Sequence, residues 1–498
     1  MLIGCADTSK RRIKSMKIFD KTVFDTKSFW MALGALLLMT PLQMWSEGTA
    51  YAFLVPLAFV ATLQGRIEQM VFWLMSSMLL IVGNSFFLPK GPAFYIAQRL
   101  LFIVLGVYML AQNVGKRQSP TVSPLMGMMF YVAYMALTAM AGWNPVISYL
   151  KLILFSFVYI AYYGVANMAG KSARFNEKEV RSIVLAIASY LFFGSLILIP
   201  FPAISQLSGE EYAVALASGQ NVVSLFKGMV MHPQALGPVV ASMFAFLFAD
   251  WVVNVRKMNW LYVALLFSGP VLVYKSSSRA GMAALLMAIL MGGFCAMKMR
   301  GVGVRWRSKV KAWLGFLFVA ALAAVLMLPN LRQAVTRFAL KYNLEARAGD
   351  FTVEEAMNTR QAIVDRQMEN FWASPMVGNG FQVSEAQIGL RNATWKELLS
   401  APVEKGVWVT AVLEEGGAIG FVILVGFFLT AGMLMLKRGA YTGLSVLAVL
   451  LVSNMAEFTM FSMSAMGGLF WAMVFIGTAM DAARIRRDQV NVYAAPWS

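Results

Sequence analysis

The feature that most constrains this chain is a long succession of apolar runs. Fourteen can be drawn, and most approach the ~20 residues that an α-helix needs to cross a bilayer. The composition agrees, since 59% of the residues are hydrophobic, only 13% are charged and the mean hydropathy is +0.66. Backbone groups inside a bilayer must bond to one another, which requires helices. The sequence therefore predicts an all-α polytopic integral membrane protein with about 14 transmembrane helices.

The predicted spans divide the chain into five parts. A basic tail covers 1–28, eleven spans lie within 29–329, an external loop covers 330–406, three spans lie within 407–482, and a second tail covers 483–498. The individual spans are 29–46, 49–64, 69–89, 93–113, 121–142, 146–169, 182–202, 233–253, 258–274, 280–297, 312–329, 407–436, 439–456 and 463–482. The external loop is far longer than an ordinary connection, so we expect it to carry structure of its own.

The distribution of charge predicts the orientation. If both termini are cytosolic, the segments on that side account for the whole net charge of +18. An excess of Lys and Arg in cytosolic loops is the rule for membrane proteins. The basic charge is thus explained without nucleic acid, and the segments 203–232 and 330–406 are predicted to lie outside.

Within the external loop, the stretch "TVEEAMNTRQAIVDRQMENFWASP" predicts one amphipathic helix. Thr352 and Glu355 have the spacing of a capping box. The residues that share one apolar stripe are Met357, Val364, Met368, Phe371 and Trp372. We expect this helix to lie on the outer membrane surface or to pack over the ends of the spans.

Four cations lie within spans or at their ends, all toward the outer side. Arg99 and Lys151 lie inside predicted spans, and Lys275 and Arg279 flank a triplet of serines. Charges in spans usually face a bundle interior or an aqueous cavity, although long side chains also snorkel to the interface. Both interpretations stay open for Lys151 and Lys275, whereas for Arg279 the functional one is preferred. Together the four would suit a lipid phosphate, which Arg binds with two parallel hydrogen bonds.

Other polar residues on the outer side are candidates for acid–base work. His232, the single histidine, precedes a predicted span, and imidazole titrates near neutral pH, although a structural role is the preferred interpretation. Glu404 lies at the start of the helix that continues into span 407–436. Glu414 and Glu415 follow on that helix, where a solvated or salt-bridged surface position is preferred because adjacent helical residues do not face one another.

Several kinds of chemistry lack their signatures. The sequence contains no P-loop, no GxSxG and no HExxH motif. Its two cysteines, Cys5 and Cys295, cannot build a disulfide framework and show no metal-ligand spacing. We therefore expect neither a metal nor a cofactor.

Four segments, in this order, resemble the O-antigen ligase and O-antigen polymerase family of membrane glycosyltransferases. They are "HPQALGP", "SSSRAGMAALL", "RQAIVDRQMENFWASPMVGNGF" and "AVLEEGGAIGF". The resemblance covers about residues 220–436 and includes the long external loop 330–406, between the predicted spans 312–329 and 407–436.

The resemblance implies a metal-independent enzyme of the bacterial inner membrane, with both termini cytosolic. Its substrate would be glycan on undecaprenyl diphosphate, and its partners the bilayer and other polysaccharide assembly proteins such as a chain-length regulator. Arg279 matches the family's arginine. Ligases of the family typically carry a histidine where this chain has Glu404-Lys405-Gly406, which favours a polymerase of O-antigen or exopolysaccharide. The site residues this implies are Glu404, Arg279 and His232 as catalytic and Arg99, Lys151, Lys275, Arg360 and Arg366 as substrate-binding.

Two alternatives within membrane glycan assembly stay open. One is an O-antigen ligase that transfers glycan to lipid A core. The other is a flippase for lipid-linked glycan, which many spans and interior cations would also suit. Transporters of that kind usually show paired halves, which this sequence does not.

Overall fold

The structure is a computed structural model of the 498-residue chain. It describes residues 25–46, 49–89, 92–113, 118–172, 174–206, 226–254, 259–276, 278–298, 361–383, 406–455, 458–462 and 466–494. Across these residues the fold is helical, and the β-type contacts are two isolated bridges, Gly83 with Val230 and Gln206 with Phe226. The all-α prediction is therefore confirmed.

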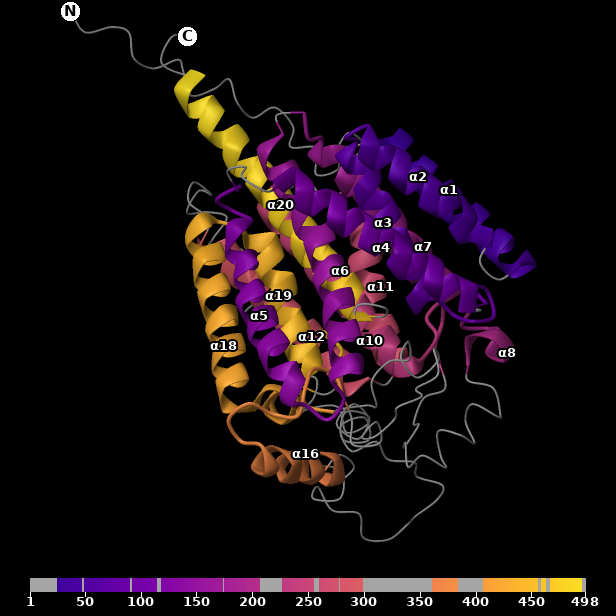
Figure 1. Ribbon diagram of the computed structural model, residues 1–498. Coiled ribbons are helices and arrows are strands. Elements are labelled where there is room, and N and C mark those ends of the chain that lie inside the picture. The colour runs from indigo at the N-terminus through magenta and orange to yellow at the C-terminus, as the bar shows by residue number, and fades with distance from the viewer. Residues whose placement is uncertain are drawn as a thin grey trace, which may run out of the picture.

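The helices form one bundle (Figure 1). In chain order they are α1 (Thr26–Trp45), α2 (Thr49–Leu63), α3 (Ile67–Val82), α4 (Pro92–Asn113), η1 (Ser123–Gly127), α5 (Met128–Thr138), η2 (Ala139–Ala141), α6 (Pro145–Lys171), α7 (Glu177–Ile197), α8 (Pro202–Ser205), α10 (Pro233–Asn254), α11 (Trp260–Ser276), α12 (Arg279–Lys298), α16 (Gln361–Ala373), α18 (Trp408–Arg438), α19 (Tyr441–Asn454) and α20 (Met466–Ala494). Two of them, η1 and η2, are 3₁₀ helices that flank α5.

Within the described part of the chain, nine helices are long and apolar enough to cross a membrane, and four shorter apolar helices accompany them. This is the architecture of a multi-pass membrane protein. The predicted number of about 14 spans is not confirmed, and the predicted span 312–329 lies outside the described residues.

The observed helices differ from the predicted spans mainly at their ends. α7 begins at Glu177 rather than 182, because the Asn176 side chain accepts hydrogen bonds from the backbone N–H groups of Lys178 and Glu179 and so caps the helix. α20 continues to Ala494, into the predicted tail. Charged residues outside a bilayer can extend a helix as readily as apolar ones, so hydropathy alone ends the span too early.

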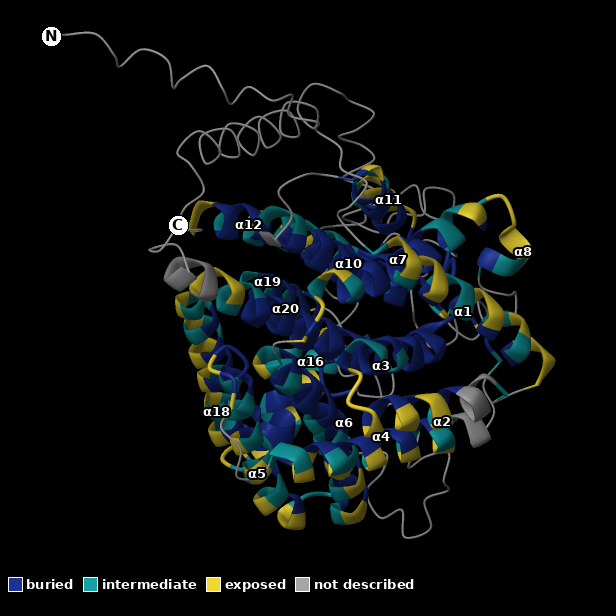
Figure 2. Ribbon diagram, turned by 90° about the horizontal axis from the view of Figure 1, so that it is seen from above, coloured by how far each residue is buried: buried dark blue, intermediate teal, exposed yellow. Residues whose placement is uncertain are grey.

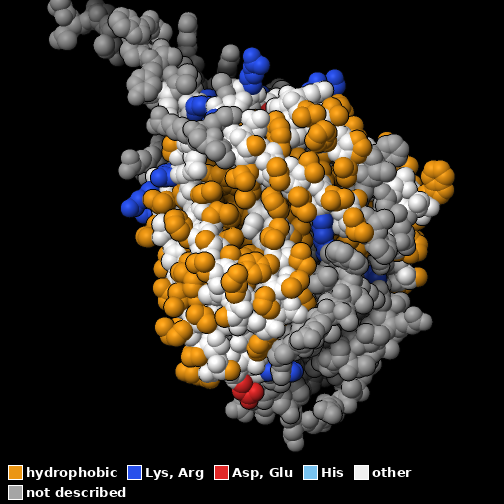
Figure 3. Space-filling model, in the orientation of Figure 1, with side chains coloured by type: hydrophobic (Ala, Val, Ile, Leu, Met, Phe, Trp, Pro, Cys, Tyr) orange, Lys and Arg blue, Asp and Glu red, His pale blue; other side chains and the backbone are white. Residues whose placement is uncertain are grey.

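The bundle has a central layer and a lipid-facing layer. α20 and α10 are almost entirely buried, whereas α1, α4, α5 and α18 each leave a wide face exposed (Figure 2). The exposed faces carry large apolar side chains such as Trp30, Leu38, Phe130, Val422 and Leu429. Figure 3 shows the resulting broad hydrophobic surface between the two ends of the bundle. Such a surface is typical of a protein embedded in lipid.

The two ends of the bundle are distinct. α1 begins and α20 ends at one end, and α16 lies across the other (Figure 1). We call them the opposite end and the α16 end. At the opposite end, Arg181 on α7 forms a bidentate ion pair with Asp250 on α10, with distances of 2.7 and 3.1 Å, and Tyr262 on α11 donates to the same carboxylate at 2.7 Å. This satisfied buried pair joins three helices.

Candidate functional site

The later part of the helix predicted in the long loop is present as α16 (Gln361–Ala373), packed against α18. Its predicted start, with Thr352, Glu355 and Met357, lies outside the described residues. The buried side of α16 is polar as well as apolar. Thr410 on α18 donates to Oε1 of Gln367 at 2.5 Å, and Asn370 Nδ2 donates to Oε1 of Glu414 at 2.8 Å. The predicted apolar stripe is wrong at Trp372, which is 69% exposed while Phe371 is buried. Neighbouring residues point about 100° apart on a helix, so both could not face the bundle.

The segment after α16, residues 374–383, docks its backbone onto α18. We call it the docking turn. The N–H of Ala418 donates to the Pro375 carbonyl at 2.8 Å, and the N–H groups of Asn379 and Gly380 donate to the carbonyls of Glu414 and Glu415 at 2.9 and 3.0 Å. Backbone groups of α18 can make these bonds because the helix is kinked at Gly417, whose φ of 62° and ψ of −170° are not helical.

Two glycines make this close approach possible. Gly378 and Gly417 both have positive φ, at 72° and 62°. A Cβ on Gly378 would overlap the backbone of Glu415 and Gly416, and a Cβ on Gly417 would overlap the backbone of Met376. The two segments therefore interlock through glycines on both sides.

We expect Gly417→Ala to release the docking turn. The substitution adds a backbone clash to the cost of about 1–3 kcal/mol for a non-glycine residue at positive φ and extended ψ. The thermal midpoint of the purified protein should fall, and protease should cleave within residues 374–383 more readily.

The matched control is Gly426→Ala on the same helix, where a Cβ meets no atom within 4 Å. Alanine is the better helix former, so this variant should be neutral or slightly stabilised. Equal behaviour of the two variants would contradict the interlock.

The other side of the docking turn is held by α6. The Phe381 N–H donates to Oγ of Ser148 at 2.8 Å, and the ammonium of Lys151 donates to the Gln382 carbonyl at 2.8 Å. Lys151 is buried, with 9% of its surface exposed. Lys151 was predicted to bind substrate, and one N–H of its ammonium is used in the hydrogen bond that holds the docking turn. Its role toward substrate stays a prediction.

Glu414 and Glu415 are buried at the kink, with exposures of 4% and 0%. The preferred sequence interpretation was a solvated or salt-bridged surface position, and its solvated form is therefore wrong. The docking turn and α16 cover this part of α18, which hydropathy along α18 alone could not reveal. Tyr134 closes the same region, where its hydroxyl donates to the carbonyls of Gly416 at 2.9 Å and Met376 at 3.2 Å.

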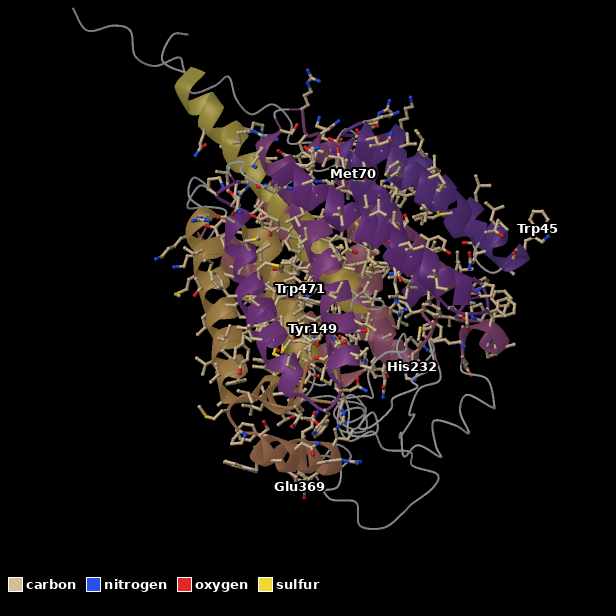
Figure 4. All side chains as sticks on the ribbon, viewed as in Figure 1. Trp45, Met70, Tyr149, His232, Glu369 and Trp471 are labelled. Atoms are coloured by element: carbon tan, nitrogen blue, oxygen red, sulfur yellow. The ribbon has the colours of Figure 1, made fainter. Side chains whose placement is uncertain are left out.

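A second polar region forms where α10 and α12 begin. The two helices run in parallel from the α16 end and cross closely near their starts, where a Cβ on Gly281 would lie 2.6 Å from the Cα of Gly237. Both N-termini therefore point the positive ends of their dipoles the same way. The residue before α10 is His232, and the first residue of α12 is Arg279. Figure 4 shows His232 toward the α16 end.

His232 caps α10 with its ring. The backbone N–H of Gln234 donates to His232 Nδ1 at 3.2 Å. A neutral imidazole that accepts at Nδ1 carries its proton on Nε2. In this arrangement Nε2–H is a donor, which suits an anion better than it suits the removal of a proton.

Serines fix the start of α12. Ser278 Oγ accepts from the N–H of Gly281 at 3.1 Å, and Ser276 Oγ accepts from the N–H of Ser278 at 3.3 Å. Arg279 follows directly and is partly exposed, whereas Lys275 is exposed in the last turn of α11, where a cation also favours the helix dipole. Two of the three serines thus fix the backbone at the start of α12, where Arg279 is the first residue.

The four predicted cations and His232 divide into two groups. Arg99 and Lys151 belong to α4 and α6, which pack on each other. His232 directly precedes α10, and Lys275 and Arg279 belong to α11 and α12. The buried helix α20 contacts both α6 and α10. The candidate site is therefore drawn at the starts of α10 and α12, and Arg99, which is half-buried, belongs to the neighbouring group.

The remaining predicted site residues are less informative. Arg366 is exposed on α16. Glu404 and Arg360 lie outside the described residues. The prediction that the helix of span 407–436 starts at Glu404 is wrong, because α18 begins at Trp408 and its N-cap residue, Val407, is extended. The structure adds Asn370, Tyr134 and Lys227, a lysine with 5% exposure, to the polar residues of the α16 end. Their sequence signals are weak: Asn370 lies within one of the four resembling segments but is not distinguished there, Tyr134 and Lys227 lie in none of them, and tertiary contacts bring the three to this end.

In the described ranges, no three His, Cys, Asp or Glu side chains are grouped as metal ligands. No protein-family model and no curated protein matches this chain.

Proposed function

We propose that this chain is a membrane glycosyltransferase that lengthens glycan carried on undecaprenyl diphosphate. The observation that carries the proposal is the pair of parallel N-termini of α10 and α12, with His232 and Arg279 at their starts. Helix N-termini bind phosphate groups, and an arginine there can add a bidentate contact. The order of the four segments that resemble the O-antigen polymerase and ligase family supports the same substrate.

The proposed reaction is a single displacement. An acceptor sugar hydroxyl attacks the anomeric carbon of a lipid-linked glycan, a carbon–oxygen bond forms, and the bond from that carbon to the diphosphate breaks. Glu404 takes the hydroxyl proton, and undecaprenyl diphosphate leaves with the bonding electron pair. Arg279 and the Nε2–H of His232 offset the negative charge that grows on the leaving group.

The α16 end serves this reaction as the proposed outer, periplasmic face. The docking turn attaches α16 to α18 through backbone hydrogen bonds and to α6 through the side chains of Ser148 and Lys151. Catalytic groups on a loop need such support, because a misplacement of about 1 Å can cost roughly 10² in rate. Both termini would then be cytosolic.

Turnover by the purified protein tests the proposal. The protein is supplied with repeat units on undecaprenyl diphosphate, and the product is resolved by length. A ladder of longer lipid-linked glycan is the expected result. Transfer to lipid A core without lengthening would instead indicate a ligase, and movement of the glycan between leaflets without a new bond would indicate a transporter and overturn the proposal.

The glycans of a deletion strain separate the first two outcomes independently. Single lipid-linked repeats accumulate when a polymerase is lost. Long lipid-linked polymer accumulates when a ligase is lost.

A further inference from the structure

A cavity of about 440 Å³ lies among α1, α2, α3 and α7, at the opposite end of the bundle from α16. These helices form a closed ring, because α1 packs on α2 and α7, and α3 also packs on α2 and α7. The volume falls within the range of small-molecule sites. We call this space the four-helix cavity.

The lining of the four-helix cavity changes from polar to apolar along the helices. Its polar residues lie at helix ends and are Ser28, Gln64, Arg66, Gln69 and Glu179. Its apolar residues lie mainly deeper and are Met31, Ala32, Ala35, Leu57, Val60, Phe72, Trp73 and Ile183. An amphiphile whose polar head lies at the membrane surface and whose chain enters the bilayer has the same gradient.

A positive and a negative side chain, Arg66 and Glu179, line the four-helix cavity and form no ion pair with each other. Arg66 lies in the turn between α2 and α3, and Glu179 lies in the first turn of α7. In the described part of the chain, neither side chain has an ion pair or a hydrogen bond. Arg66 and Glu179 are therefore more than 4.0 Å apart, so a ligand that carries both charges could bind each of them.

Glu179 lies near two other negative charges. The carboxylates of Glu68 and Asp25 are close enough to act electrostatically on the Glu179 carboxylate. Both are already engaged, since Glu68 accepts from the Asn176 N–H at 2.7 Å and Asp25 caps α1. A cationic group would be attracted to Glu179, while Arg66 would attract a phosphate.

We propose that the four-helix cavity binds phosphatidylethanolamine. The primary ammonium donates hydrogen bonds to Glu179, the phosphate accepts them from the Arg66 guanidinium, and one acyl chain fills the apolar part. Phosphatidylcholine lacks the N–H donors, and phosphatidylglycerol lacks the cation. The site does not depend on the proposed glycosyltransferase activity.

Native mass spectrometry of the delipidated full-length protein tests this proposal. The protein is titrated with phosphatidylethanolamine, phosphatidylcholine and phosphatidylglycerol of identical acyl chains. Phosphatidylethanolamine is expected to bind at least tenfold more tightly than either of the others. Equal binding of the three lipids would overturn the proposal.

Variants locate the binding to this cavity. Ala35→Trp should fill the apolar part and remove the tight binding, and Glu179→Gln should abolish the preference over phosphatidylcholine while the protein stays monodisperse. The control is Leu38→Trp on the same helix, at a side chain that is 67% exposed. Loss of the preference in the control, or its survival in both cavity variants, would contradict the site.

Discussion

Arg279→Ala should leave a folded protein whose glycan turnover falls by roughly 10²–10³, the usual effect of removing one contact to a charge that grows in the transition state. The fold should survive because the start of α12 is fixed by Ser276 and Ser278 and by the close approach of Gly281 to Gly237, and none of these contacts involves the arginine side chain. The measurement is the rate at which the purified variant lengthens lipid-linked glycan.

Two further variants separate binding geometry from charge. Arg279→Lys should also lose most of its activity, since an ammonium has no planar fork for two parallel bonds to phosphate. Lys298→Ala removes an exposed cation from the last turn of the same helix, at its other end, and should retain near-normal turnover. If Arg279→Ala is as active as Lys298→Ala, Arg279 is an interfacial anchor.

Glu404→Gln should lower turnover by about 10²–10⁴, the range that general base catalysis typically supplies. The amide keeps the size and much of the hydrogen bonding of the carboxylate but cannot take a proton from the acceptor hydroxyl. The same lipid-linked assay, run as single turnover, measures the loss in the chemical step. If Glu404 only adds a negative charge before the N-terminus of α18, its substitution should cost about 1 kcal/mol of stability or less and should leave turnover unchanged.

His232→Asn is the matched comparison for Glu404→Gln. Asparagine is among the best helix-capping residues, so it can replace Nδ1 in accepting the Gln234 N–H while it removes Nε2. Because Nε2 is a donor in the capped arrangement, we expect a loss of about tenfold, the size of one hydrogen bond to a charged group. An active Glu404→Gln together with an inactive His232→Asn would reverse the two roles.

The structure also gives the candidate residues an order of importance that their positions in the sequence could not. Lys151 and Arg279 look alike along the chain, since each is a cation near the outer end of an apolar run. In the bundle, Lys151 donates to the Gln382 carbonyl and holds the docking turn, while Arg279 begins a helix beside the start of α10. Substitution of Lys151 therefore tests the attachment of the loop, and substitution of Arg279 tests the proposed chemistry.

The sequence by itself determined that the described part of the chain consists mainly of apolar helices, because hydropathy is a local property of each run. It located α16 for the same reason, since an amphipathic period needs no knowledge of its partner. It also singled out Arg279, because a charge between apolar runs is costly wherever the helices pack.

Only the tertiary structure decided what covers each polar group. The burial of Glu414 and Glu415 depends on the docking turn, which lies more than thirty residues before them in the sequence. The close approach of Gly237 to Gly281, and the four-helix cavity between Arg66 and Glu179, likewise join segments that are distant along the chain. Hydropathy describes how a residue meets solvent or lipid, whereas these features arise from which helix lies next to which, and that is settled by packing across the bundle.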